Sequence, residues 1–114
     1  MAMSDTLDPE DTKLVTLARG ARGRVSAATG AALRDETGRT YSAADVTLSS
    51  LRISALELAI AQAVASGARG VEAAAVVTDD PDDFAVPAAL AELGPTAYVI
   101  VCRSDGSVVH RASA

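Results

Sequence analysis

The sequence predicts an α/β fold, a three-layer α/β/α sandwich around a mixed five-stranded sheet. Apolar segments with helical and strand-like spacing alternate in the order helix, two strands, helix, strand, helix, two strands. The 114 residues are 49% hydrophobic, which is enough for one modest core and excludes a chain disordered throughout. We therefore expect a single domain over residues 9–114 after a disordered tail over residues 1–8.

The first helix is predicted over residues 9–21. Asp8 suits an N-cap, Pro9 suits the first helical position, and Glu10 and Asp11 place acids in the first turn. A turn over residues 35–38 separates strands over 30–33 and 39–46. The second helix is expected to begin at Ser49 or Ser50 and to end at Ala65.

The second half of the chain reads as strand, helix and two strands. Residues 71–77 and 97–102 are apolar runs typical of buried strands. Between them, a short helix is predicted over 86–93, ended by Gly94 and Pro95. Residues 107–110 would form an edge strand.

Composition and charge exclude several classes of partner. The net charge is −5, the basic residues are scattered, and aromatic residues are few, so we expect no nucleic-acid partner. No apolar run approaches the roughly 20 residues that span a bilayer, and no signal peptide is visible, so we expect no membrane partner. A single cysteine, Cys102, excludes an internal disulfide and fits a reducing compartment. A cytoplasmic protein of a GC-rich bacterium is the resulting expectation.

Three segments of the chain resemble the cytidine deaminase family. They share apolar framework residues with its hairpin, its active-site helix and the strand after that helix: Gly30-Ala31-Ala32-Leu33 with Gly38-Arg39 and Tyr41, residues 54–67, and Val76-Val77 with Asp79. The similarity spans most of residues 30–91, with a short deletion between residues 46 and 54. The resemblance implies a cytidine deaminase-like fold and assembly as a dimer or tetramer.

The resemblance also implies that the catalytic positions have lost their chemistry. The family binds zinc through a Cys or His at the helix start and through a Pro-Cys-x-x-Cys turn, and a Glu shuttles protons. In this chain the zinc positions fall on Ser54, Ala88 and Ala91, and the Glu position falls on Leu56. These side chains offer no thiolate or imidazole donor and no proton carrier. We therefore expect no catalytic residue, no metal and no cofactor.

A remnant of the ligand pocket is predicted at four residues: Asp45, Thr47, Ser54 and Glu57. Asp45 and Thr47 fall where the family grips the ribose, and Asp45 keeps an acceptor for a ribose hydroxyl. Glu57 follows Leu56 by one position, a turn of about 100° around the helix. Shifting the comparison with the family by one residue would place Glu57 at the position of the proton-shuttling Glu, but it would also place Ala55, which has no donor atom, at the metal position.

Other candidate sites have alternative interpretations. Asp79, Asp80, Asp82 and Asp83 form an acidic loop that would suit Ca²⁺ or Mg²⁺, or a solvated loop in which Asp82 or Asp83 stabilises the next helix. No EF-hand spacing accompanies it. His110 reads as a surface residue and Cys102 as a small buried hydrophobe. A nucleophilic serine at position 54 would need a nearby base, and none is identifiable.

Two hypotheses for function remain open at this point. The first is a non-catalytic cytidine deaminase-like protein with a binding, assembly or regulatory role. Ala59, Ala61, Ala63 and Ala65 would let a second copy approach the helix in a homo-oligomer, although packing within one chain uses the same kind of face. The alternative is an enzyme or sensor of nucleoside metabolism, a cytidine deaminase-type hydrolase that binds a nucleoside by an atypical site. An open cavity among Ser54, Leu56, Ala88 and Ala91 would favour ligand binding, and a filled one a structural role.

Overall fold

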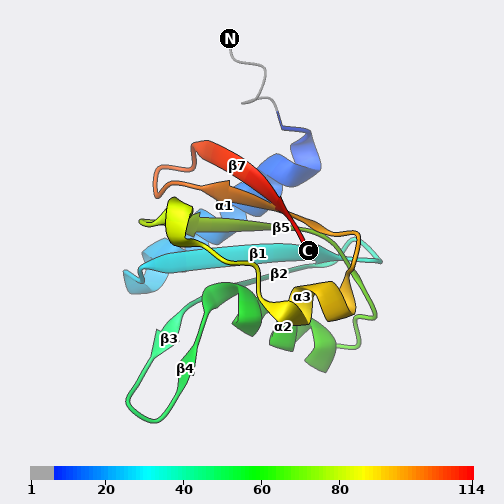
Figure 1. The fold of residues 1–114 in the computed structure, drawn as a ribbon, viewed down its shortest axis with the longest axis horizontal. Helices are drawn as coiled ribbons and strands as arrows, with labels where there is room; N and C mark the ends of the chain where they lie inside the picture. The colour runs from blue at the N-terminus through cyan, green and yellow to red at the C-terminus, as the bar shows by residue number, and fades with distance from the viewer. Residues whose placement is uncertain (1–6) are drawn as a thin grey trace.

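A five-stranded mixed sheet forms the centre of the computed structural model, which describes residues 7–114 (Figure 1). Its strand order is β2-β1-β5-β6-β7, with β5 and β6 parallel and the other neighbours antiparallel. The elements are α1 (Pro9–Val25), β1 (Thr29–Asp35), β2 (Thr40–Ala44), α2 (Ala55–Ala65), β5 (Val71–Thr78), α3 (Ala88–Leu93), β6 (Tyr98–Cys102) and β7 (Val108–Ser113). The predicted α/β fold and the order of these eight elements are confirmed.

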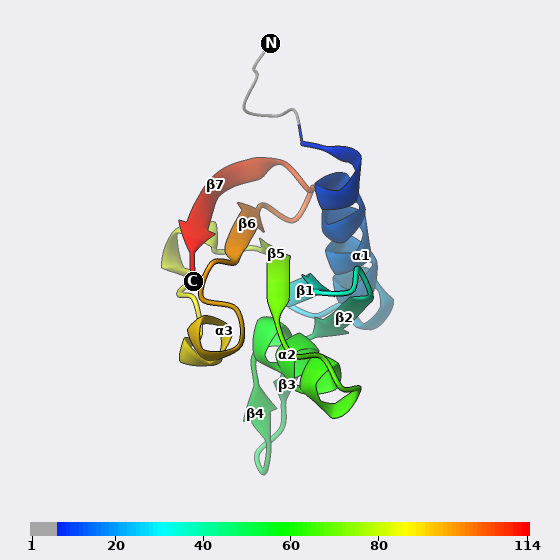
Figure 2. The ribbon, with the colours of Figure 1, turned by 90° about the vertical axis from the view of Figure 1, so that its right-hand side faces the viewer.

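Helices cover both faces of this sheet, α1 on one side and α2 with α3 on the other (Figure 2). Alternate residues of a strand point to opposite faces, so β5 contributes to two cores. Ala75 and Val77 pack with Leu14 of α1, whereas Val76 packs with Leu56 of α2. Most sheet positions that face α1 are alanine or valine, and α1 therefore lies close to the strands.

Helix α1 lies directly against the sheet at Gly30 in β1. A Cβ atom placed on Gly30 would lie 2.1 Å from the carbonyl oxygen of Ala18 and 2.8 Å from the Cβ of Arg22. Both contacts belong to α1 and are shorter than atoms tolerate. Only glycine fits at this crossing, which holds α1 across the start of β1.

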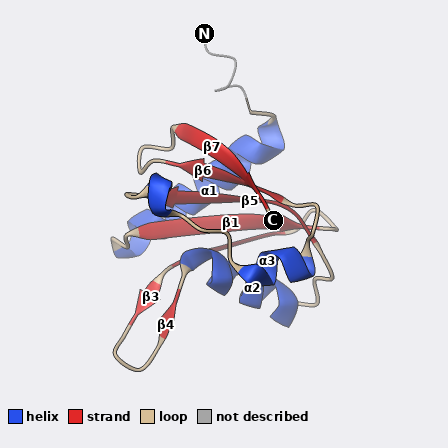
Figure 3. Cartoon of the chain, in the orientation of Figure 1, coloured by secondary structure: helices blue, strands red, loops and turns tan. Residues whose placement is uncertain are grey.

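The start of the second helix was predicted wrongly. Residues 46–53 form a separate antiparallel hairpin of β3 (Val46–Thr47) and β4 (Arg52–Ile53), and α2 begins only at Ala55 (Figure 3). Leu48 and Leu51 have helical spacing in sequence, but they lie on the two sides of a turn closed by a hydrogen bond from Leu48 N to Leu51 O of 2.8 Å. The predicted strand over 39–46 accordingly ends at Ala44.

Other boundaries shift by a few residues. α1 continues to Val25, where Ser26 caps it in the left-handed conformation with φ 53°. α3 begins at Ala88, and the preceding Pro81–Asp83 is a single 3-10 turn. The alanines of α2 divide between two faces: Ala59 and Ala63 are buried in the core, and only Ala61 and Ala65 are exposed. Ala59 and Ala63 therefore serve packing within the chain, the alternative use of such an alanine face.

Residues 1–6 of the predicted disordered tail lie outside the described residues. Leu7 packs against the α1 side of the core. Asp8 caps α1, because its carboxylate accepts a hydrogen bond of 2.9 Å from Asp11 N. Within residues 7–114, no helix combines the length and the apolar character needed to cross a bilayer.

Candidate functional site

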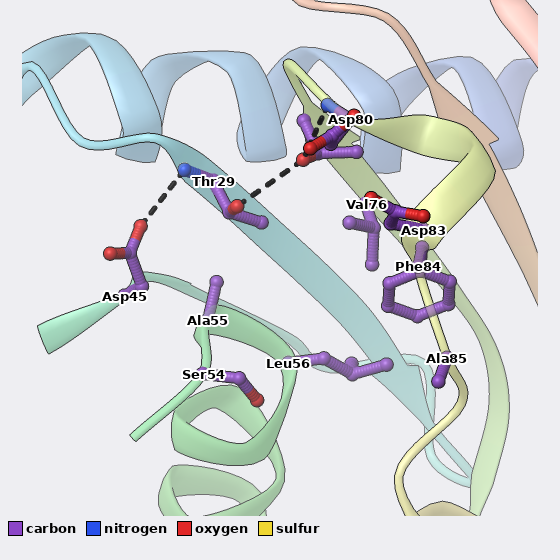
Figure 4. A pocket seen from close by; sticks show the side chains of 11 residues that line it. Thr29, Asp45, Ser54, Ala55, Leu56, Val76, Asp80, Asp83, Phe84 and Ala85 are labelled. Atoms are coloured by element: carbon purple, nitrogen blue, oxygen red, sulfur yellow. Dashed lines mark hydrogen bonds between the residues drawn. The ribbon is translucent and has the colours of Figure 1, made fainter. Parts of the chain in front are cut away.

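A cavity of about 290 Å³ opens beside the first turn of α2 (Figure 4). It lies where β5 ends and β1 begins, and the loop after β5 forms its far wall. Ligand sites of α/β proteins concentrate outside the carboxyl ends of their strands, which is where Thr78 and the residues that follow it lie. The cavity is thus the leading candidate for the functional site.

Hydroxyl and carboxylate groups form the rim of the cavity. Asp45 accepts a hydrogen bond of 2.8 Å from Thr29 N, and the hydroxyls of Thr29 and Thr78 lie 3.4 Å apart. Asp80 N donates to the Thr78 hydroxyl at 3.2 Å. The carboxylates of Asp80 and Asp83 also line the opening, and no lysine or arginine is among its described lining residues. The rim therefore carries negative charge.

The floor of the cavity is apolar. Leu56 and Val76 are buried, with Leu56 2% exposed, and Phe84 is half-buried beside them. The Leu56 side chain extends from α2 towards Phe84 and Ala85 on the opposite wall (Figure 4). An acidic, hydroxyl-rich rim over an apolar floor suits a small ligand with a flat apolar part and hydroxyl donors.

Ser54 is the N-cap of α2 and is held there by Glu57. The Ser54 hydroxyl accepts a hydrogen bond of 3.2 Å from Glu57 N and donates one of 2.9 Å to the Glu57 carboxylate. The same carboxylate oxygen accepts from Ser54 N at 3.3 Å, which completes a capping box. Ser54 therefore caps the N-terminus of α2, and the Glu57 side chain is directed back to Ser54 at the start of the same helix.

The structure brings only part of the predicted site together. Asp45 and Ser54 line the cavity with Leu56. Thr47 and Glu57 line a shallower depression beside the β3–β4 hairpin, which shares Asp45 and Ser54 with the cavity. The predicted remnant of four residues therefore spans two adjoining hollows.

Ala88 and Ala91, expected across the cavity from Ser54, are exposed on α3 and do not line it. Phe84 and Ala85 occupy that wall instead. Leu90 points into the core, and neighbours one or two positions away on a helix then point elsewhere.

Eight lining residues escaped the prediction of a ligand pocket: Thr29, Ala55, Val76, Thr78, Asp80, Asp83, Phe84 and Ala85. The position of Thr78 and Asp80 directly after a buried strand was a usable signal. Phe84 is the only phenylalanine in the chain, but nothing in its sequence neighbourhood distinguishes a cavity wall from a loop residue.

The acidic loop is divided among different environments. Asp79 forms an ion pair of 2.8 Å with Arg22 of α1, while Asp80 and Asp83 face the cavity. Asp82 and Asp83 precede α3 by several residues, so neither stabilises its N-terminus, contrary to that prediction. Over residues 7–114, no three His, Cys, Asp or Glu side chains are grouped in a way that would hold a metal ion.

The lone cysteine and the lone histidine lie away from the cavity. Cys102 is fully buried on the α1 face of the sheet, as predicted, and burial together with the charge of Asp105 raises the pKa of its thiol to about 11. His110 is exposed on β7, also as predicted.

A zinc ion, which the resemblance implies, does not fit the residues beside the cavity. Zinc sites use thiolate, imidazole or carboxylate donors. The residues at the positions that the resemblance assigns to zinc and its proton carrier are a hydroxyl engaged in a helix cap, a buried leucine and two exposed alanines. The carboxylates of Asp45, Asp80 and Asp83 line the cavity, but among residues 7–114 they form no group of three metal donors. Neither Cys102 nor His110 lies at the cavity to replace them.

Comparison with known proteins connects this geometry to a family. A crystal structure of cytidine deaminase from Burkholderia pseudomallei is similar to this chain, with 28% identity and a TM-score of 0.74, over 89% of this chain and 90% of that one. No curated protein matches the chain. The model of the cytidine deaminase-like family matches residues 7–106. The chain belongs to the cytidine deaminase-like family.

Proposed function

We propose that this chain is a non-catalytic cytidine deaminase-like protein that binds an unphosphorylated nucleoside in the cavity at the start of α2. One observation carries the proposal. The cavity keeps an open, hydrogen-bonding rim, while Ser54 and Leu56 at its α2 wall supply neither a metal donor nor a proton carrier.

The loss of catalysis follows from what deamination requires. Zinc deaminases activate a metal-bound water and move protons with a carboxylate that is not a zinc ligand. Leu56 at the position of that carboxylate is buried and apolar. Glu57 is the nearest carboxylate on α2, but it lines the neighbouring depression and is bonded to Ser54. A bound nucleoside would therefore meet no carboxylate of α2 that could move protons as the family's Glu does.

Binding of a nucleoside is supported by the two surfaces of the cavity. Asp45 uses one carboxylate oxygen to accept from Thr29 N, and its other oxygen accepts only a long hydrogen bond of 3.5 Å from the Thr47 hydroxyl, which leaves a lone pair free. That second oxygen is available to a sugar hydroxyl, and hydrogen bonds to a charged acceptor are the stronger kind. Leu56, Val76 and Phe84 provide an apolar surface for a base.

The charge of the rim selects against phosphate. Asp45, Asp80 and Asp83 all line the cavity, and like charges brought together at an interface cost binding energy. Arg22 is paired with Asp79 and is not among the residues at the opening. We therefore expect a nucleoside to bind and its 5′-monophosphate to bind far more weakly.

Metal content and turnover test the catalytic half of the proposal. The protein is purified without chelators, its zinc is measured by elemental analysis, and cytidine conversion is followed by absorbance. We expect substoichiometric zinc and no conversion above a buffer blank. One zinc per chain, or deamination that scales with protein concentration, would establish the alternative of an active hydrolase.

Ligand-dependent thermal stabilisation tests the binding half. Cytidine and uridine should raise the melting temperature saturably, as any ligand specific for the folded state does, and cytidine monophosphate should not. Asp45→Asn keeps an acceptor for Thr29 N but loses the charge, and should weaken binding about tenfold or more. Asp82→Asn removes the same charge from a residue outside the cavity and should leave binding unchanged. A response equal for all variants, or none to any nucleoside, contradicts binding at this cavity.

A further inference from the structure

A second hollow lies on the opposite face of the sheet from the cavity at α2. It is a groove of about 330 Å³ between α1 and the turn that joins β6 to β7. Figure 2 shows this turn reaching α1. Val15, which lines the groove, packs with the α1 side of the core, whereas Leu56 and Val76 of the cavity pack with the α2 side. The groove is therefore a separate hollow, at the low end of the roughly 300–1,000 Å³ of small-molecule sites.

One face of α1 and the β6–β7 turn form the two walls of the groove. Thr12, Val15, Thr16 and Arg19 are three or four positions apart, so they share a face of the helix. Residues 105–108 line the opposite wall. The walls meet where a Cβ placed on Gly106 would lie 2.9 Å from Arg19 Cδ. The aliphatic part of Arg19 thus packs directly on the backbone of the turn.

Arg19 gives the groove a positive charge that no residue of the described chain neutralises. It takes part in none of the ion pairs of residues 7–114. A guanidinium group has a planar set of N–H donors that matches a carboxylate. Because its aliphatic part already lies against Gly106, Arg19 would lose less conformational freedom on binding than a fully mobile side chain. Arg19 is therefore suited to bind a carboxylate.

Asp105 gives the same groove a negative charge. Its Oδ1 accepts hydrogen bonds of 2.7 Å from Ser107 Oγ and 2.8 Å from Ser107 N. These bonds, and after them the charge of Arg19, outweigh burial and lower the pKa of Asp105, so the carboxylate is ionised at neutral pH. Within residues 7–114, Asp105 forms no ion pair with Arg19 or with any other residue. Its Oδ2 is therefore available to a cationic group.

We propose that this groove binds a free α-amino acid with an apolar side chain, the carboxylate on Arg19 and the ammonium group on Asp105. The side chain of the ligand lies on the apolar floor of the groove. That floor consists of Leu7, Val15 and Val108, of which Val15 is buried and the other two are half-buried. The proposed site is independent of the nucleoside cavity.

The pair of opposite charges selects a ligand that carries both charges. A simple anion would be repelled by Asp105, and a simple cation by Arg19. A neutral molecule would cover both charges without pairing them, which costs binding energy. The hydroxyls of Thr12 and Thr16 also line the groove, and the Thr16 hydroxyl donates to Thr12 O at 3.1 Å, which leaves its oxygen able to accept from an ammonium group.

Isothermal titration calorimetry with L-leucine tests the site. Leucine should bind saturably at one site per chain. Isocaproate lacks the ammonium group, isopentylamine lacks the carboxylate and free glycine lacks the side chain, so each should bind about tenfold more weakly or worse. Saturating cytidine should leave the affinity for leucine unchanged. Leucine that cytidine displaces would occupy the cavity at α2, and that result would overturn the assignment to the groove.

Charge-neutralising variants locate the two contacts. Arg19→Gln and Asp105→Asn should each weaken leucine binding about tenfold or more, because each leaves one charge of the ligand unpaired. Asp105→Asn keeps an oxygen that can accept from Ser107 N, so the turn is retained. Arg24→Gln removes the same charge as Arg19→Gln from an exposed position of α1 outside the groove, and should leave binding unchanged.

Circular dichroism of each variant shows that it remains folded. No saturable binding of leucine up to about 10 mM would overturn the proposal, since such an affinity is too weak for a site. Equal binding of isocaproate or isopentylamine would overturn it, because one charge would then suffice. An effect of Arg24→Gln as large as that of Arg19→Gln would overturn it as well, because the response would then reflect the net charge of the chain.

Discussion

The hydroxyl of Tyr98 lies 2.8 and 3.0 Å from the two carboxylate oxygens of Asp11, a residue 87 positions away in the chain. Asp11 is 1% exposed, in the first turn of α1, and Tyr98 begins β6. Arg34 of β1 adds a contact of 3.3 Å to the same carboxylate. One buried charge therefore fastens α1 to two strands, and it is satisfied by its partners, as a buried charge must be.

Removing the Tyr98 hydroxyl should lower the free energy of unfolding. Tyr98→Phe leaves the ring in place and deletes a hydrogen bond to a charged acceptor, a change of about 1.5–3 kcal/mol. Urea denaturation followed by circular dichroism measures it. Arg111→Met is the control: Arg111 is half-exposed, and its nitrogen lies 3.8 Å from Asp11. Its loss should cost less than about 1 kcal/mol. Equal effects of the two changes would show that Asp11 is solvated.

Ionisation of Asp35 should make the free energy of unfolding depend on pH. Burial alone would raise its pKa, but hydrogen bonds from the Thr37 hydroxyl and amide, the Arg39 amide and the Tyr41 hydroxyl outweigh burial, so its pKa is lowered. A lowered pKa in the folded state stabilises the protein above the unfolded value near 3.9, and that contribution is lost as the pH falls through the folded pKa.

The measurement is urea denaturation at a series of pH values from 7 to about 3, spanning the unfolded pKa. Asp35→Asn cannot ionise, so its free energy of unfolding should approach that of the natural sequence as the pH falls. Hydrogen bonds from the Arg69 and Gly70 amides lower the pKa of Glu36, and hydrogen bonds from Ser107 lower the pKa of Asp105. Only the difference between the two proteins therefore reports Asp35. A difference constant with pH would contradict the assigned ionisation.

Local signals in the sequence predicted most of the fold correctly. Asp8 and Pro9 fixed the start of α1, because capping depends on adjacent residues. The apolar runs in β5 and β6 identified strands that are buried on both faces. The prediction of a helix over residues 46–53 was wrong because the local signals there are ambiguous. Leu48 and Leu51 fit a helical period as well as a turn, and only contacts across the hairpin decide between them.

The candidate site was predicted less completely. Asp45 and Ser54 belong to segments that the resemblance aligned, and both line the cavity. Phe84 reaches it through a loop whose path depends on the 3-10 turn at Pro81–Asp83. The outward direction of Ala88 and Ala91 follows from the burial of Leu90 against α2 and the sheet. These placements come from tertiary packing, which a spacing of residues in sequence does not specify.

Ser54 should prove to be a structural cap. Ser54→Ala removes the hydroxyl that accepts from Glu57 N, at a cost of about 0.5–2 kcal/mol in the free energy of unfolding. Ser54→Asp supplies another strong N-cap oxygen and should recover most of that loss. Ser50→Ala, in the exposed hairpin turn, is the control and should be neutral. Failure of Ser54→Asp to exceed Ser54→Ala in stability would mean that the serine matters for something other than capping.

Gly30 should tolerate no side chain, because the α1 backbone lies against it. The Cβ of Gly30→Ala would lie 2.1 Å from Ala18 O and 2.9 Å from Arg22 N, and neither backbone atom can rotate away. Overpacking of this kind costs about 1–3 kcal/mol or more, and the helix must shift from the sheet to relieve it.

Gly23→Ala is the matched control. Its added methyl group meets nothing within 4 Å, and alanine favours a helix over glycine by about 0.5–1 kcal/mol. We therefore expect thermal and urea denaturation to move in opposite directions for the two variants. Because Arg22 also bonds Asp79 beside the cavity, the Gly30 variant should bind nucleoside more weakly than the Gly23 variant.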